Sequence, residues 1–146
     1  MLAVKNYTQE YVDECRARVD ERLAKYRTLA SAARDLAGPE VGPLERAFGE
    51  FYPVFFATQV VVLDGCFANR LRAAEGKDGN PANEVRVIAA SVLGGDDRML
   101  ADPTIRFDVA KTVLHLAPGD PVALDEQDFV ALAAAFFAEI DKRYVV

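Results

Sequence analysis

The polar side chains best placed to bind a ligand in this 146-residue chain gather around a turn in its middle. Asp64 directly follows an apolar run, and a carboxylate in such a place must be paired, solvated or protonated. Arg70 and Arg86 could pair with it. If these side chains converge on a cavity, they form a small polar pocket; the alternative is that they only cap a helix, reverse the chain and form structural ion pairs. The cluster comprises Asp64, Asn69, Arg70, Lys77, Asp78, Asn80, Asn83, Glu84 and Arg86, and all of these except Glu84 are candidate ligand-binding residues.

The sequence carries no recognisable catalytic or metal-binding signature. His115 is the one histidine, and no Gly-x-Ser-x-Gly motif supplies a nucleophile for it, so we expect it to be structural. Gly76-Lys77 lacks the Ser or Thr and the earlier glycine of a phosphate-binding loop. The run that starts at Asp78 fails as a calcium loop at its fifth, sixth and twelfth positions. We therefore expect no catalytic residue, no metal and no cofactor, and a non-enzyme is the simpler interpretation.

The formal net charge of -6 argues against two classes of partner. A general nucleic-acid binder, or a protein that docks on an anionic membrane, needs clustered Lys and Arg, so neither partner is expected. The apolar run around Val60–Leu63 is far shorter than the ~20 residues of a membrane span. No secretory signal is recognisable at residues 1–6, and Cys15 and Cys66 are best interpreted as reduced thiols, so we expect a cytoplasmic protein.

Helical periodicity dominates the first third of the chain. Apolar residues recur every three or four positions from Val12 to Ala37, which predicts one long helix with a single apolar stripe. Asn6 or Thr8 could cap its start, and Gly38-Pro39 should end it, because glycine accepts a left-handed conformation and proline cannot continue a helix.

The segment at about 53–75 is predicted to be the central helix, around which the others pack. Its run Val60–Leu63 is β-branched and would also suit a buried strand, but the only turn signal in the segment is Gly65, and the segment is too long for one strand. A helix that is apolar on several sides is enclosed by neighbours, so we expect this one to be buried. Pro53 lacks an N–H group, which predicts a kink or a break near Tyr52.

Two further helices are predicted in the second half of the chain. Asn80 can cap the first of them, Pro81 suits its first turn, and Gly94-Gly95 should end it. Asp125 can cap the last helix, with Asp128 in its first turn.

A small β-hairpin is predicted between these two helices, at about 104–124. Apolar and polar residues alternate from Thr104, and a Pro-Gly turn lies at 118–121. The predicted fold class is therefore mainly α: a single helical domain at 1–146, in which four to five helices form a bundle around the helix at about 53–75.

Two stretches carry a resemblance to other proteins. The loop Gly76–Arg86, with the sequence GKDGNPANEVR, and the segment Phe136–Ile140, with the sequence FFAEI, resemble a family of uncharacterised bacterial cytosolic proteins, as does Gly119-Asp120. The resemblance covers roughly the C-terminal two thirds of the chain, and Thr112–Leu114 stands where that family is expected to have Ser-Val-Leu. It implies a bacterial, single-domain, cytosolic protein and assigns no catalytic residue.

The aromatic residues at 51–56 and 129–137 indicate a core, with a dimer interface as the alternative. Helices that are apolar on more than one side often bury a face against a second copy. We therefore expect a non-enzymatic interaction or scaffold protein that is a homodimer and can bind another protein partner. The alternative is a small-molecule binding protein, or an unrecognised enzyme, that uses Asp64 and the loop at 77–86.

Overall fold

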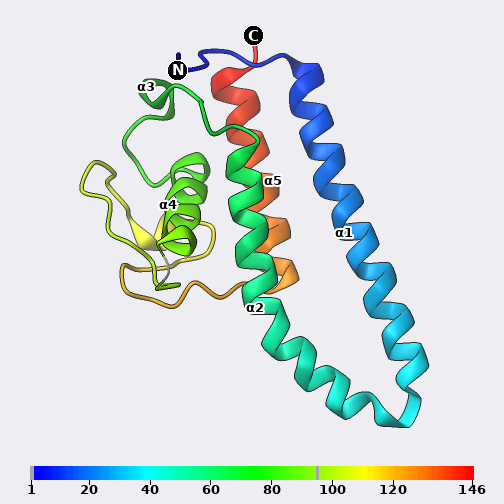
Figure 1. The fold of residues 1–146 in the computed structure, drawn as a ribbon. Coiled ribbons are helices and arrows are strands. Elements are labelled where there is room, and N and C mark those ends of the chain that lie inside the picture. Colours follow the sequence, from blue (N-terminus) through cyan, green and yellow to red (C-terminus); the bar gives the residue numbers. More distant parts are fainter. Residues whose placement is uncertain (1, 95) are drawn as a thin grey trace.

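The computed structural model describes residues 2–94 and 96–146. Within these ranges the chain forms four long helices and one single helical turn: α1 (Gln9–Ala37), α2 (Val41–Gly65), α3 (Arg72–Glu75, the single turn), α4 (Pro81–Leu93) and α5 (Glu126–Tyr144). Two short 3-10 helices are η1 (Gly38–Glu40) and η2 (Val109–Lys111) (Figure 1). The prediction of a mainly helical fold is confirmed.

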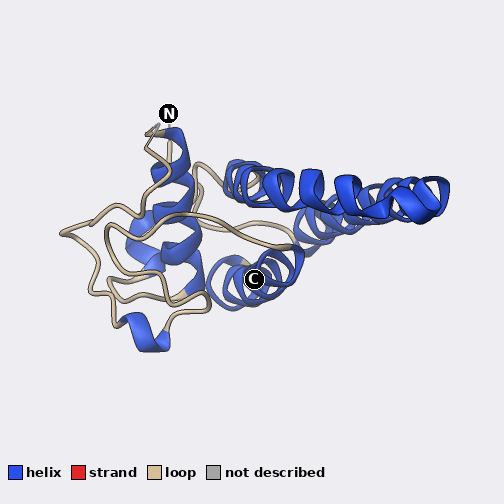
Figure 2. Cartoon of the chain, turned by 90° about the horizontal axis from the view of Figure 1, so that it is seen from below, coloured by secondary structure: helices blue, strands red, loops and turns tan. Residues whose placement is uncertain are grey.

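α2 is the helix against which the other long helices pack. α1 and α2 form a long antiparallel hairpin, α5 packs against both, and α4 contacts α2 on the side away from α1 (Figures 1 and 2). The apolar stripes that the sequence shows on these helices meet in one core. Its buried side chains include Val12, Cys15, Val19 and Leu23 of α1, Phe56, Val60 and Leu63 of α2, Val85 and Ile88 of α4, and Phe129, Leu132, Phe136 and Ile140 of α5.

The start of each of α1, α4 and α5 is capped as the sequence predicts. Thr8, Asn80 and Asp125 each accept hydrogen bonds from backbone N–H groups of the first turn, which otherwise lack a partner within the helix. α1 ends at Ala37 and is capped by Gly38, whose φ of 51° lies in the region that favours glycine. Of the predicted Gly94-Gly95 stop, the first residue caps α4 and the second lies outside the described residues.

The central helix ends earlier than predicted. α2 stops at Gly65 and not near Glu75, because the chain turns tightly and then becomes extended before α3. In the extended stretch Leu71 N–H donates to the carbonyl of Val4 (2.8 Å), and Val4 N–H donates to the carbonyl of Asn69 (2.7 Å). Local periodicity could not predict this end, because the pairing partner is the distant N-terminal segment.

α2 is also less enclosed than predicted. Val60 and Leu63 are buried, but Val62 between them remains 38% exposed. α1, α4 and α5 cover only part of the helix circumference, so the valine run is apolar on more sides than its neighbours cover.

The predicted β-hairpin at about 104–124 is wrong. Among the described residues there is no sheet, and the extended contacts are isolated bridges such as Asp78 with Arg106. The N–H groups of Val113–Leu114 donate to the carboxylate of Glu84 on α4, so a side chain takes the place of a neighbouring strand. The alternating pattern therefore lies in an irregular loop that contains a turn, one isolated bridge and the start of η2.

The α1–α2 hairpin continues beyond the N-terminal end of α5 as an arm, which we define as residues 29–55 (Figure 1). α2 changes direction about halfway along its length, and Pro53 lies in that part of the helix, so the predicted kink is present without a break. Among residues 29–55, all of which the structure describes, Ala30 alone is buried. The arm therefore has almost no core of its own.

Candidate functional site

Arg70 is the centre of a buried ion network just beyond the C-terminal end of α2. Its guanidinium group donates to Asp64 Oδ1 (2.8 Å) and to Glu75 Oε1. It also donates to the carbonyl oxygens of Phe67 (3.1 Å) and Ala82 (2.9 Å). Burial alone would lower the pKa of Arg70, but the two carboxylates outweigh it and the pKa is raised. Arg70 is thus a cation whose donors are used inside the chain.

Glu75 joins this network to α4, and the sequence did not predict its role. Its carboxylate accepts hydrogen bonds from Arg86 Nε (3.1 Å) and Nη2 (3.0 Å) in addition to Arg70. A helix that continued to residue 75 would have left Glu75 and Arg70 available to water, whereas both are buried. The one sequence signal that could have shown this is Gly65, because a helix that ends there no longer fixes the direction of later side chains.

Two asparagines organise the polar turn before α4. Asn80 Nδ2 donates to the carbonyl of Glu75 (2.7 Å) and to Asp78 Oδ1 (2.9 Å), while Asn80 Oδ1 caps the helix. Asn83 Nδ2 donates to the carbonyl of Asp78 (2.8 Å). These contacts hold the turn to the start of the helix.

The candidate residues named from the sequence thus lie in one region but mainly bind one another and the backbone. The side chains of Asn69 and Lys77 are exposed, and their carbonyl oxygens accept N–H groups from distant segments. None of the eight lines either of the two cavities described below. A ligand-binding role stays a prediction that these contacts do not favour; the residues are Asp64, Asn69, Arg70, Lys77, Asp78, Asn80, Asn83 and Arg86.

Glu84 has a structural role that helical periodicity does not show. The side chain is buried on α4, and its two oxygens accept the backbone N–H groups of Val113 and Leu114 (2.9 Å each). Burial raises the pKa of the Glu84 carboxyl, although the two hydrogen bonds act in the opposite direction. Glu84 therefore anchors the loop between α4 and α5.

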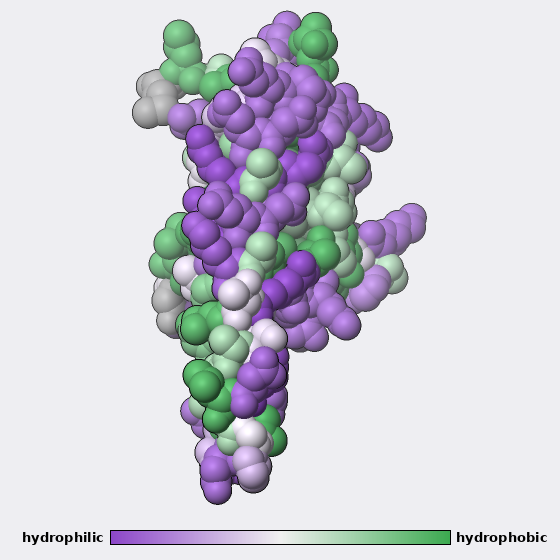
Figure 3. All heavy atoms as spheres, turned by 90° about the vertical axis from the view of Figure 1, so that its right-hand side faces the viewer, coloured by the Kyte–Doolittle hydropathy of each residue, from purple (hydrophilic) through white to green (hydrophobic). Residues whose placement is uncertain are grey.

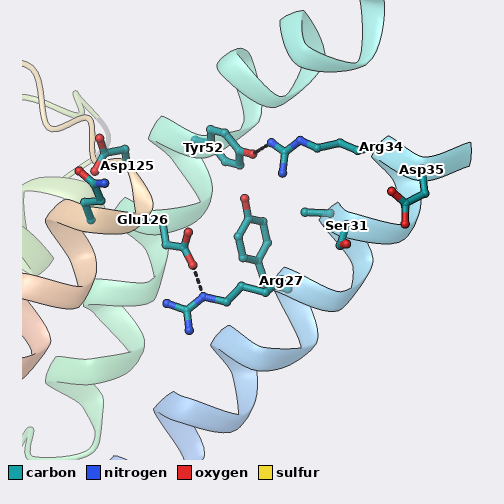
Figure 4. A pocket seen from close by; sticks show the side chains of 10 residues that line it. Arg27, Ser31, Arg34, Asp35, Tyr52, Asp125 and Glu126 are labelled. Carbon is teal, nitrogen blue, oxygen red and sulfur yellow. Dashed lines mark hydrogen bonds and ion pairs between the residues drawn. The ribbon is translucent and has the colours of Figure 1, made fainter. Parts of the chain in front are cut away.

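A cleft of about 590 Å³ lies at the base of the arm, between α1, α2 and the N-terminal end of α5 (Figure 4). Its volume is in the range of small-molecule sites. Arg27 pairs with Glu126 of α5 (2.5 Å), and Arg34 donates to the Tyr52 hydroxyl (2.6 Å) and pairs with Glu45 (2.6 Å). Both guanidinium groups are thus engaged by neighbours, and the contacts tie α1 to α5 and to α2.

The arm also presents a set of exposed apolar side chains, which we call the arm face: Leu29 (69% exposed), Leu36 (89%), Phe51 (47%) and Val54 (67%). Leu29 and Phe51 line one groove of about 360 Å³ between α1 and α2. Leu36 lies two turns after Leu29, and Val54 lies one turn after Phe51, so each pair shares one side of its helix. Figure 3 shows hydrophobic side chains on the protruding part of the molecule, below a mostly hydrophilic part.

No known protein family, curated protein or solved structure matches this chain. The resemblance of the loop at 76–86 to a bacterial family therefore stays a prediction. None of the described helices combines the length and the apolar character needed to cross a membrane.

Proposed function

We propose that the chain is a non-enzymatic interaction module that forms a homodimer through the arm face. The observation that carries the proposal is the burial pattern of the arm: within residues 29–55 Ala30 alone is buried, whereas the four side chains of the arm face are exposed. The expectation of a bacterial, cytosolic protein, which comes from the sequence, is part of the same proposal.

The physical reason is that a two-helix arm without a core is more stable when another apolar surface packs against it. Isolated helices are marginal in water, and most helical stability in proteins comes from packing an apolar face. Full burial of one exposed Leu, Val or Phe side chain contributes about 1.5–3 kcal/mol. In a symmetric dimer each copy contributes the same side chains to the interface, so one contact between two copies buries both arm faces.

The aromatic residues of α2 support this division between core and surface. Phe56 is fully buried against α1 and α5, whereas Phe51 is 47% exposed and stacks on the half-buried Phe55 at a centroid distance of 4.9 Å. The aromatic cluster therefore runs from the core out onto the arm. The alternative function, ligand binding or catalysis at Asp64 and the loop at 77–86, has less support because most of those side chains bind one another or the backbone. Among the described residues, the buried Asn83 Oδ1 lacks a hydrogen-bond partner.

A charge placed in the arm face tests the proposal. Val54→Glu puts a carboxylate at a side chain that is already 67% exposed, so the folded monomer should tolerate it. In a dimer the change occurs twice and buries two carboxylates, so we expect the dissociation constant to rise by about 100-fold or more. Sedimentation velocity over a concentration series measures it.

Leu93→Glu is the matched control, because Leu93 is also an exposed aliphatic side chain at a helical position (74% exposed) but lies at the end of α4, away from the arm. It should leave the dissociation constant unchanged. Equal weakening by both variants, or by neither, would contradict an interface on the arm.

A further inference from the structure

We propose that the groove between α1 and α2 that Leu29 and Phe51 line, which we call the arm groove, binds an amphipathic anion of the fatty-acid class. The carboxylate of the ligand contacts Arg22, and its unbranched acyl chain lies along the aromatic side chains toward Phe48. The consequence for assembly, that this ligand competes with a second copy of the chain, rests on the proposed homodimer, whereas the binding site does not.

One end of the arm groove is polar and the other is apolar. α1 and α2 run antiparallel, and Tyr26 of α1 stacks on Phe55 of α2 at a centroid distance of 5.6 Å (Figure 1). Arg22 precedes Tyr26 by one turn and Gln59 follows Phe55 by one turn, so Arg22 and Gln59 face each other across the groove that both line. The other end, toward the tip of the arm, is lined by Leu29, Phe48 and Phe51.

The arm groove ends at its polar side. Arg22 and Gln59 also line a second cavity between the same helices, but its volume is only about 10 Å³, which is no more than one water molecule needs. From Gln59 to Phe48 the groove follows α2 for about 16 Å. Its volume of about 360 Å³ lies in the range of small-molecule sites. A narrow chain with its charged group at one end therefore fits this shape.

The charges along the arm groove select an anion. Among the described residues, Arg22 and Lys25 are the charged side chains that line it, and no carboxylate does. Lys25 already pairs with Glu21 (3.0 Å), whereas the exposed Arg22 forms no ion pair and no side-chain hydrogen bond within the described part of the chain. A guanidinium group can donate two parallel hydrogen bonds to a carboxylate, and the amide of Gln59 can donate a third.

The larger cleft at the base of the arm does not suit the same ligand. Its lining includes the carboxylates of Asp35, Asp125 and Glu126, which would repel an anion. Its two guanidinium groups are engaged by carboxylates of the chain, Arg27 by Glu126 and Arg34 by Glu45. Of these two sites, only the arm groove combines an available cation with an apolar wall.

The ligand and a second copy of the chain compete for the same side chains. Leu29 and Phe51 belong to the arm face, which the proposed homodimer buries, and both also line the arm groove. An apolar side chain that the acyl chain already covers gains little from further burial by a second copy. A ligand that binds the monomer more tightly than the dimer shifts the equilibrium toward the monomer. The concentration of the acyl anion therefore controls assembly.

Titration calorimetry with dodecanoate, below the concentration at which it forms micelles, tests the site. We expect saturable binding of one dodecanoate per chain. Arg22→Glu should raise the dissociation constant by about tenfold or more, because a carboxylate replaces the guanidinium group that holds the ligand. Arg46→Glu is the control, since it makes the same charge change at an exposed position of α2 outside the groove, and its effect should stay within about twofold.

Two further probes separate the contributions of the charged group and the acyl chain. Acetate has the carboxylate without the chain, and dodecyltrimethylammonium has a chain of the same length with the opposite charge. Each should bind at least about tenfold more weakly than dodecanoate. Absence of saturable dodecanoate binding, equal binding of the two dodecyl probes, or an equal loss of affinity in Arg22→Glu and Arg46→Glu would overturn the site.

Sedimentation velocity tests the competition. Dodecanoate at about ten times its dissociation constant should raise the dissociation constant of the wild-type dimer by about tenfold or more. The same dodecanoate concentration should leave the dimer of Arg22→Glu nearly unchanged. A wild-type dimer that dodecanoate does not weaken would overturn the competition. A wild-type chain that is monomeric at about 100 μM without ligand would refute the homodimer, and the titration would still decide whether the arm groove binds the anion.

Discussion

At the scale of single residues, the clearest feature is that Arg70 is buried between two carboxylates. Removal of one member of a buried ion pair is costly because it leaves the other charge in a poorly solvated place. Asp64 needed a partner by its position after an apolar run, and the sequence correctly suggested Arg70 as a candidate, at 2.8 Å in the structure. Glu75 was not predicted, because its burial depends on where α2 ends.

Arg70→Met should lower the free energy of unfolding by about 3–5 kcal/mol, since Glu75 and Asp64 lose their shared cation. Arg72→Met is the control, because the Arg72 side chain is 53% exposed and its ion pair with Asp102 is long, at 3.8 Å. The change in the free energy of unfolding should stay within about 0.5 kcal/mol. Urea unfolding measures both. A loss below about 1 kcal/mol for Arg70→Met would show that the network contributes little.

The buried carboxyl of Glu84 should make stability depend on pH. Its pKa is raised by burial above the ordinary value of 4.5, so the folded chain binds this proton more tightly than the unfolded chain. The contribution of Glu84 is thus fully present below that ordinary value and declines as the pH rises through the raised pKa. Glu84→Gln does not titrate and lacks this decline.

The measurement is the difference in unfolding free energy between the wild type and Glu84→Gln, by urea titration from about pH 3 to about pH 7. The advantage of the wild type should shrink as the pH rises. An advantage that grows with pH would mean that the hydrogen bonds to Val113 and Leu114 outweigh burial.

At the scale of elements, features that depend on neighbouring residues could be predicted from the sequence. Features that depend on residues far away in the chain could not. Thr8, Asn80 and Asp125 act within the first turn of their own helices, so their caps could be predicted. The end of α2 depends on Val4, and the conformation of the loop after α4 depends on Glu84, each far away in the sequence. Alternation of apolar residues therefore predicted a hairpin where the chain forms an irregular loop with a turn and the 3-10 helix η2.

The bend of α2 at Pro53 sets the direction of the arm. A substitution that removes the bend should weaken self-association. Pro53→Ala restores an N–H group that can donate to the carbonyl of Gly49, so the helix should straighten and turn the arm face away from its position. Sedimentation velocity should show a dissociation constant raised by about tenfold, a free-energy change of ~1.4 kcal/mol.

Gly49→Ala is the control for helix propensity in the same turn. A Cβ atom at this position meets no other atom within 4 Å, and the proline remains in place. It should leave the dissociation constant unchanged. If Pro53→Ala also leaves it unchanged, the direction of the arm does not matter for assembly.

At the scale of the whole molecule, the part outside the arm, which we call the body, buries the apolar stripes of four helices. The arm at residues 29–55 leaves its own apolar side chains exposed. The surplus of apolar helix faces was visible in the sequence and suggested a second copy. The sequence could not locate that surplus, because it predicted that the helix at about 53–75 would be enclosed. Burial shows that the uncovered part is the hairpin at 29–55, where residues such as Phe51 and Val54 have no helix of the body across from them.

The mass of the purified chain in solution, measured by light scattering during size-exclusion chromatography, is the most direct test of the homodimer. At about 100 μM we expect a mass of twice the 16.0 kDa of one chain for the wild type, and the mass of one chain for Val54→Glu at the same concentration. A wild-type mass of 16.0 kDa at every concentration up to that level would contradict it.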